Sequence, residues 1–189
     1  MKIVIDTENF TKEQSEMLFQ IIGKQYALSL SGKERSEMLE NRLRSVIGET
    51  KPDTTDYDFC SGDDYFFGNL KIELKQFDAL GSSPKLQQVK PTLYDNILVV
   101  AEYPNKSEWW VIKSDKISSK SGKENKEEDK LTLQRQHKDS EFEGQVSFTG
   151  PFKKSATKIY ESTPIDYTEE TLNLSDQDIL TILTLTKNH

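Results

Sequence analysis

Three residues between positions 64 and 75 have the types and spacing that phosphoryl chemistry requires. Glu73 and Lys75 are two apart in a β-favouring run, 70–76, so a strand places both on one face of a sheet. The two residues 68–69, Gly-Asn, are typical of a tight hairpin turn back to the run 64–67. The turn brings Asp64 opposite or diagonal to Glu73. The sequence therefore predicts two carboxylates near enough to share one cation, with a lysine beside them.

The cation that suits such a pair is Mg²⁺. Two carboxylates in one cleft repel each other unless a divalent cation supplies compensating charge. Mg²⁺ prefers oxygen ligands and often uses one or two carboxylates beside a phosphate. One cysteine and two histidines are too few for a Cys/His zinc site. Lys75 would orient a water or stabilise charge on a phosphate, whereas the alternative is a weak ion pair on an exposed strand.

The elements before the hairpin begin with a short strand at 2–5 and a helix from Thr11 to Gly23. A second helix is expected at about 34–47, with Leu39 and Leu43 on its apolar face and Gly48 at its end. Glu40 lies at the edge of that face, so this helix could present an acidic side chain near the core.

The elements after the hairpin alternate between apolar and polar runs. Residues 97–103 are typical of a buried strand, and further strands are expected at 108–112, 131–135 and 144–148. Residues 85–94 favour a short helix interrupted at Pro91. The Ser175 and Asp178 pair indicates the start of a C-terminal helix, although its four threonines leave a strand open.

The 189 residues predict one domain of mixed α/β class, spanning 1–189, with a mobile loop at about 113–130 that is rich in Lys, Ser and Glu. Its hydrophobic fraction of 34% and aromatic fraction of 10% are sufficient for a core. No apolar run is long enough to span a membrane, and the first residues lack a signal-peptide pattern. We therefore expect a soluble, cytoplasmic protein.

The stretch 62–75, which reads GDDYFFGNLKIELK, resembles the Asp strand, turn and Glu-x-Lys strand of the PD-(D/E)XK nuclease superfamily, and within it the type II restriction endonucleases. The resemblance extends through 86–91, 94–95, 97–103 and 109–110 to 134–138, or about half of the chain. It implies Mg²⁺-dependent hydrolysis of DNA phosphodiester bonds on a mixed central sheet flanked by helices.

Carried over by position, the resemblance makes Asp64 and Glu73 metal ligands and Lys75 the catalytic lysine. No proline precedes Asp64, and Asp63 is an adjacent alternative. The family often adds an acidic residue from the preceding helix, for which Glu40 is chosen over Glu34 and Glu37 because it flanks the buried face. Gln87 and Gln88 could reach the metal site or a DNA phosphate from the expected helix at 85–94, or only cap that helix.

A run of long donors and acceptors follows the loop, and it is the candidate for base recognition. Arginine pairs bidentately with guanine and glutamine with adenine in the major groove. A solvated surface strand is the alternative of equal weight. The run consists of Gln134, Arg135, Gln136, His137 and Lys138.

The net charge of -7 excludes a globally basic surface, but residues 106–158 carry more basic than acidic side chains. Double-stranded DNA remains the expected partner. A palindromic recognition site would match a two-fold homodimer. The alternatives are a repair, phage or mobile-element nuclease of the same fold, and a non-catalytic DNA-binding or assembly protein.

Overall fold

The computed structural model describes residues 11, 30–48, 64–67, 70–79, 84–122, 127–139, 141–168 and 172–189, with the backbone alone at 64–67. Three predictions from the sequence fall outside these residues. They are the strand at 2–5, the helix at 11–23 except for Thr11, and the alternative ligand Asp63. The described part is of mixed α/β class, as expected, with two mixed sheets and three α-helices.

The first sheet has five strands in the order β1-β2-β4-β5-β9. Strands β1 and β2 pair in antiparallel fashion and β4 runs parallel to β2, while β5 and β9 continue antiparallel. The structure thus confirms the hairpin and the strands expected near 97–103 and 108–112. The strands are β1 (Asp64–Phe67), β2 (Leu70–Asp78), β4 (Asn96–Glu102), β5 (Ser107–Lys113) and β9 (Thr157–Ser162).

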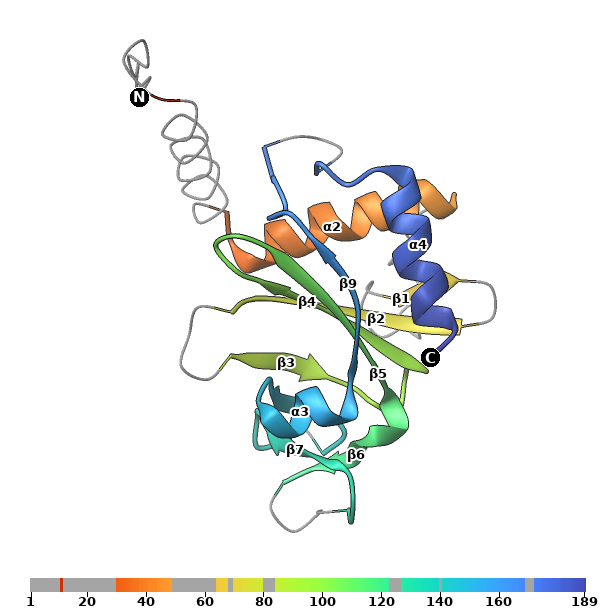
Figure 1. The fold of residues 1–189 in the computed structure, drawn as a ribbon. Helices are drawn as coiled ribbons and strands as arrows, with labels where there is room; N and C mark the ends of the chain where they lie inside the picture. Colours follow the sequence, from red (N-terminus) through yellow and green to blue (C-terminus); the bar gives the residue numbers. More distant parts are fainter. Residues whose placement is uncertain are drawn as a thin grey trace.

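Two helices, α2 (Gly32–Ile47) and α4 (Asp176–Lys187), cover one face of this sheet (Figure 1). Each begins in a reciprocal capping box, from Ser31 to Glu34 and from Ser175 to Asp178, which satisfies backbone N–H groups of the first turn. The C-terminal element, for which the sequence left a strand open, is therefore a helix. One apolar core joins the helices to the sheet and includes Leu39, Leu43, Ile72, Leu74, Leu98, Val100, Trp109, Ile179 and Ile182.

The opposite face of the first sheet is covered by a second sheet and one short helix (Figure 1). The resemblance implied helices as the flanking elements, and here four short strands bury the apolar side chains of that face instead. The strand order of the second sheet is β3-β8-β7-β6, and the short helix is α3 (Gly150–Ser155). The strands are β3 (Lys85–Val89), β6 (Ile117–Ser121), β7 (Leu131–Arg135) and β8 (Gly144–Ser147). The second core includes Leu86, Val89, Ile97, Val99, Ile112, Ile117, Leu133, Val146 and Phe152.

The helix expected at 85–94 is wrong, because residues 85–89 form strand β3. The register between β3 and β8 shifts between Leu86 and Val89, and Gln88 has a φ of 52°. This bulge adds a residue to the strand, so two buried side chains three positions apart reach the same core. A spacing of three is also the spacing of a helix, which explains the wrong assignment.

The loop expected at about 113–130 is also shorter than predicted. Residues 114–116 form a 3₁₀ turn and residues 117–121 form β6, which runs parallel to β7. Two of the serines that suggested a solvated loop, Ser118 and Ser121, are buried there, and their hydroxyls bond to backbone. Ser118 Oγ donates to the Lys120 carbonyl, and Ser121 Oγ donates to the Glu141 carbonyl, both at 3.0 Å. Polar side chains satisfied in this way fit a strand as well as a loop.

No α-helix within the described ranges is long and apolar enough to cross a membrane.

Candidate functional site

The β1–β2 hairpin places Asp64 directly opposite Glu73 in the strand register. This confirms the sequence prediction for the backbone positions. The side chain of Asp64 is not among those described. Directly opposed residues of an antiparallel pair have neighbouring Cβ positions on one face of the sheet.

Glu73 and Lys75 form a close ion pair on the face of the first sheet that meets the second sheet. Lys75 Nζ lies 2.8 Å from Glu73 Oε1, and the side chains are 15% and 2% exposed. Their neighbours in the register on β4 are Ile97 and Val99, both in the second core. The pair is therefore desolvated, unlike the weak surface ion pair that was the alternative.

The Glu73 carboxylate is incompletely satisfied. Burial raises the pKa of Glu73, and this effect is opposed by the ammonium of Lys75 and by the backbone N–H of Lys90, which donates to the carboxylate. Glu73 Oε2 is buried and has no hydrogen-bond partner among the described residues. A buried carboxylate oxygen without a hydrogen-bond donor lowers the stability of the fold. A cation bound at Glu73 Oε2 would remove this cost.

Lys90 is a part of the site that the sequence did not reveal. It directly follows β3, and its ammonium also acts on Glu73 through space. Lys90 Nζ lies 3.6 Å from Glu143 Oε2, just before β8. The expected helix at 85–94 concealed this contact, since only the β3 bulge and the second sheet bring Lys90 to Glu73.

Glu40 is not brought to this site. It is buried on α2, where its Oε1 accepts from Ser36 Oγ at 3.4 Å. Helix α2 packs on the Ile72 and Leu74 face of β2, whereas Glu73 faces the second sheet. The helix glutamate and the strand glutamate thus lie on opposite sides of the sheet.

The expected recognition run lies at the end of β7 and in the turn after it. Gln134 and Arg135 pair in register with Gln145 and Gly144 of β8. Gln136 is partly buried, and its Oε1 accepts the backbone N–H of Gln88 at 3.0 Å, so the structure brings these two predicted DNA contacts together. The other four members of the run are exposed, namely Gln134, Arg135, His137 and Lys138.

A row of paired residues across strands β3, β8 and β7 connects the recognition run to the neighbourhood of Glu73. Gly144 pairs with Val89 on one side and Arg135 on the other. A Cβ at Gly144 would lie 2.3 Å from the Gln134 carbonyl oxygen, so only glycine permits this approach. Because Lys90 follows Val89 directly, the run and the Glu73 carboxylate belong to one hydrogen-bonded unit.

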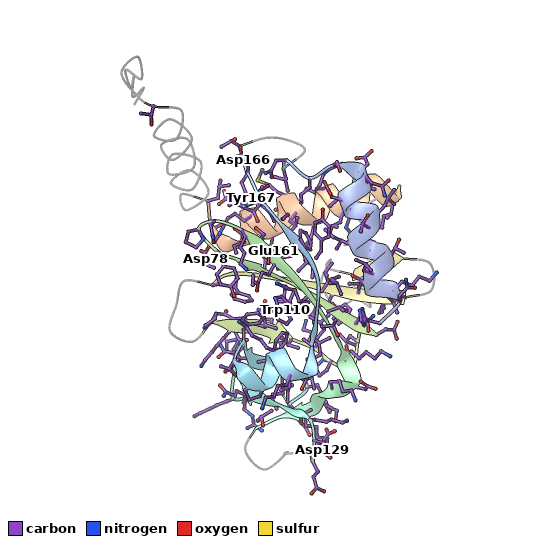
Figure 2. All side chains as sticks on the ribbon, in the orientation of Figure 1. Asp78, Trp110, Asp129, Glu161, Asp166 and Tyr167 are labelled. Carbon is purple, nitrogen blue, oxygen red and sulfur yellow. The ribbon has the colours of Figure 1, made fainter. Side chains whose placement is uncertain are left out.

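A second polar cluster lies on the other face of β2, and the sequence did not indicate it. Arg35 in the first turn of α2 binds both oxygens of Asp78, at 3.1 and 3.0 Å. Glu102 Oε1 accepts from Tyr167 and Gln76, and Glu102 Oε2 lies 3.7 Å from Arg35. Figure 2 shows Asp78 and Tyr167 close together beside the start of α2.

Burial sets the proton affinities in this second cluster. It raises the pKa of Glu102, against the donors Tyr167, Arg35 and Gln76. It also raises the pKa of Tyr167 well above the usual value, and the Glu102 carboxylate adds to that rise. The cluster is therefore built to keep Tyr167 protonated as a donor.

Comparison with family models, with curated proteins and with solved structures finds no match to this chain. Within the described ranges, no three His, Cys, Asp or Glu side chains form a group that could hold a metal. Asp64, whose side chain is not described, would have to supply the second carboxylate beside Glu73.

Proposed function

We propose that this chain is a Mg²⁺-dependent endonuclease of the PD-(D/E)XK type that hydrolyses DNA phosphodiester bonds, and that it is a sequence-specific type II restriction enzyme acting as a homodimer. The observation that carries the proposal is the buried Glu73–Lys75 pair, with Glu73 Oε2 left without a described partner. A buried, unsatisfied carboxylate beside a lysine is expected at catalytic sites, where perturbed proton affinities cluster.

The donor set fits Mg²⁺ in its chemistry. Glu73 would hold the cation together with Asp64, its register partner. When bound, Mg²⁺ would supply Lewis-acid chemistry at the phosphoryl group. Glu40 is left out of this ligand set because α2 covers the opposite face of the sheet.

The protein's own groups have separate tasks. Lys75 favours the ionised form of Glu73 despite its burial. An ammonium has three donors, so Lys75 can also orient a water or bond to a phosphate oxygen. The Lys90 N–H fixes the carboxylate in place.

DNA binding is assigned to the exposed members of the run at 134–138, which the second sheet connects to Glu73. A bidentate arginine contact contributes about 1–3 kcal/mol of base discrimination. Replacing Arg135 by Ala should therefore weaken binding to the cognate duplex about tenfold to a hundredfold. A random duplex should lose much less, whereas equal losses on both would assign Arg135 to the phosphate backbone.

The test is cleavage of phage and supercoiled plasmid DNA with Mg²⁺, and with EDTA as the control. Discrete fragments are expected from the wild type, and none from Glu73→Gln or Lys75→Ala. Glu161→Gln is the matched control, because Glu161 is an exposed glutamate that also pairs with a lysine. Its cleavage should equal that of the wild type.

The outcomes separate the proposal from its alternatives. Nicking that follows DNA structure and ignores sequence would identify a repair, phage or mobile-element nuclease. Tight DNA binding without cleavage at any Mg²⁺ concentration would identify a non-catalytic DNA-binding protein. Cleavage that persists in Lys75→Ala would remove the lysine from the mechanism.

A further inference from the structure

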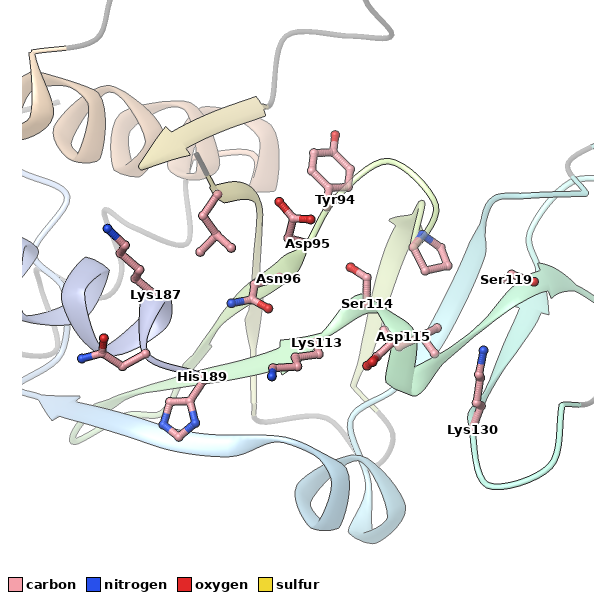
Figure 3. A pocket seen from close by; sticks show the side chains of 14 residues that line it. Tyr94, Asp95, Asn96, Lys113, Ser114, Asp115, Ser119, Lys130, Lys187 and His189 are labelled. Carbon is pink, nitrogen blue, oxygen red and sulfur yellow. The ribbon is translucent and has the colours of Figure 1, made fainter. Parts of the chain in front are cut away.

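A cavity of about 690 Å³ lies at the end of the first sheet where β2 and β4 begin and β5 ends (Figure 3). Its volume is within the range of small-molecule binding sites. Leu70, Pro91 and Ile117 supply its apolar wall. Pro91 directly follows Lys90, whose backbone N–H donates to Glu73, so the cavity adjoins the candidate site.

The charged side chains that line the cavity nearly compensate one another. They are three lysines and two aspartates, namely Lys113, Lys130, Lys187, Asp95 and Asp115. Lys130 is also paired with Glu127, at 2.5 Å, and Lys187 interacts with another group of the chain. A lining without a clear excess of either charge suits an uncharged polar ligand better than an anion or a cation.

Ser114 places an unsatisfied hydroxyl in the cavity wall. The residue is 5% exposed, and its Oγ is buried without a hydrogen-bond partner among the described residues. A buried hydroxyl without a partner lowers stability, and it gains a hydrogen bond from a ligand acceptor that enters the cavity.

Asp95 supplies an acceptor opposite this hydroxyl. The Ser114 N–H donates to the Asp95 carbonyl at 2.9 Å, which continues the β4–β5 ladder one position beyond its last paired residues. Opposed residues of an antiparallel pair have Cβ atoms about 5 Å apart on one face. Asp95 Oδ2 accepts the Lys71 N–H at 2.8 Å, which leaves Oδ1 for a ligand donor. Figure 3 shows the Ser114 hydroxyl directed towards the side of the cavity where Asp95 lies, and the Asp115 carboxylate directed away from it.

We infer that this cavity binds a nucleobase, which donates to Asp95 Oδ1 and accepts from Ser114 Oγ. Nucleobases carry donors and acceptors side by side along one edge, and their neutral rings match the compensated lining. The ring has an apolar face for the wall of Leu70, Pro91 and Ile117, which a sugar lacks. The base belongs either to a free nucleoside or to an unstacked nucleotide of a DNA strand. Only the second source rests on the proposed function.

The test is a nuclear magnetic resonance titration of the full, isotope-labelled chain without divalent cations. Deoxyguanosine, deoxyadenosine, deoxycytidine and thymidine are added separately, and deoxyribose is the control for the sugar. A single-stranded oligonucleotide and an abasic strand of equal length then test the strand. The amide resonance of Ser114 reports binding at the cavity, because this N–H lies in the wall beside the proposed contacts.

Four variants separate the proposed contacts from the charge of the lining. Ser114→Ala should weaken binding about fivefold, the size of one neutral hydrogen bond, without lowering the thermal midpoint, because its Oγ has no described partner to lose. Asp95→Asn should weaken it about tenfold, because the amide oxygen keeps the Lys71 N–H and the NH₂ group then faces the ligand. Lys113→Gln and Asp115→Asn are the matched controls. Each changes the charge of the same lining by one, and both should bind as the wild type does.

The outcomes locate the base or overturn the inference. An oligonucleotide that moves the Ser114 resonance when the abasic strand does not would assign the base to a DNA strand. A response to nucleosides alone would assign it to a free nucleoside, and this result stands even if the chain cleaves no DNA. The inference is overturned if neither the nucleosides nor the oligonucleotide moves the resonance, if deoxyribose binds equally well, or if the control variants lose as much affinity as Ser114→Ala.

Discussion

Strand β2 contacts acidic side chains on each of its faces, a part-buried cluster on the helical face and a buried carboxylate on the other, and the two sites differ in how their carboxylate oxygens are satisfied. On the helical face, both oxygens of Asp78 bind Arg35, and Glu102 faces Tyr167, Gln76 and Arg35. On the other face, Glu73 has Lys75 and the Lys90 N–H, but its Oε2 has no described partner.

This difference separates a structural cluster from a candidate functional one. A buried carboxylate whose oxygens all face donors is compensated within the fold, and its loss is felt as lost stability. A buried carboxylate with an open oxygen costs stability until a cation or another ligand arrives. The helical cluster is not complete in every atom, since Arg35 Nε and Gln76 Oε1 lack described partners, but those atoms are not anionic oxygens.

The largest expected effect is that of Arg35→Ala. The substitution leaves the part-buried carboxylates of Asp78 and Glu102 without their shared cation, and we expect a cost of about 3 kcal/mol of unfolding free energy, the lower end of the range for buried pairs. Urea unfolding measures the loss. Mg²⁺ binding by the remaining folded protein should not change, and a change would show that the two faces are not independent.

Tyr167→Phe should have the next largest effect. It removes a donor to the buried Glu102 carboxylate, and a lost hydrogen bond to a charged group costs about 1.5–3 kcal/mol. Thermal unfolding at matched pH provides the measurement. An unchanged midpoint would mean that the helical cluster is no better compensated than the Glu73 site.

Glu73→Gln should act through pH. Folding raises the pKa of Glu73 above its usual value of 4.5, so the folded protein binds this proton more tightly than the unfolded chain does. The resulting stabilisation is fully present below pH 4.5 and is lost as the pH rises through the pKa of the folded state. Each tenfold difference in proton affinity between the folded and unfolded chain corresponds to about 1.4 kcal/mol, and Gln does not titrate. Unfolding free energies from pH 4 upward should therefore decline in the wild type relative to Glu73→Gln. Parallel curves would show that folding does not raise the pKa of Glu73.

The smallest effect is expected from Gln136→Ala. The lost acceptor for the Gln88 N–H costs about 1 kcal/mol and loosens the β3 bulge that leads to Lys90. The proposed cleavage should slow with little change in DNA affinity. Gln136→Glu keeps the acceptor and should restore the rate, and Gln177→Ala, at an exposed glutamine on α4, is the control. If Gln136→Ala instead lowers affinity for cognate DNA alone, Gln136 reads bases directly.

Elements with local signals could be predicted from the sequence. Apolar spacing and Gly48 predict α2, the Ser175 and Asp178 pair predicts α4, and the Gly-Asn sequence predicts the β1–β2 hairpin with Asp64 opposite or diagonal to Glu73. These signals suffice because a helix cap or a two-residue turn involves residues only a few positions apart. The placement of Glu73 and Lys75 on one face follows from the same alternation.

Only the tertiary structure decided which elements meet each face of the first sheet. The bulge in β3 gives this strand the apolar spacing of a helix, so the sequence predicted a helix there. The pairing of β3, β8, β7 and β6 joins residues up to about sixty positions apart, which no local pattern specifies. The sequence alone determined the two strand positions that define the candidate site. The burial of Glu73, its contact with Lys90 and the exclusion of Glu40 came from long-range packing, because burial and compensation depend on neighbours that no local pattern specifies.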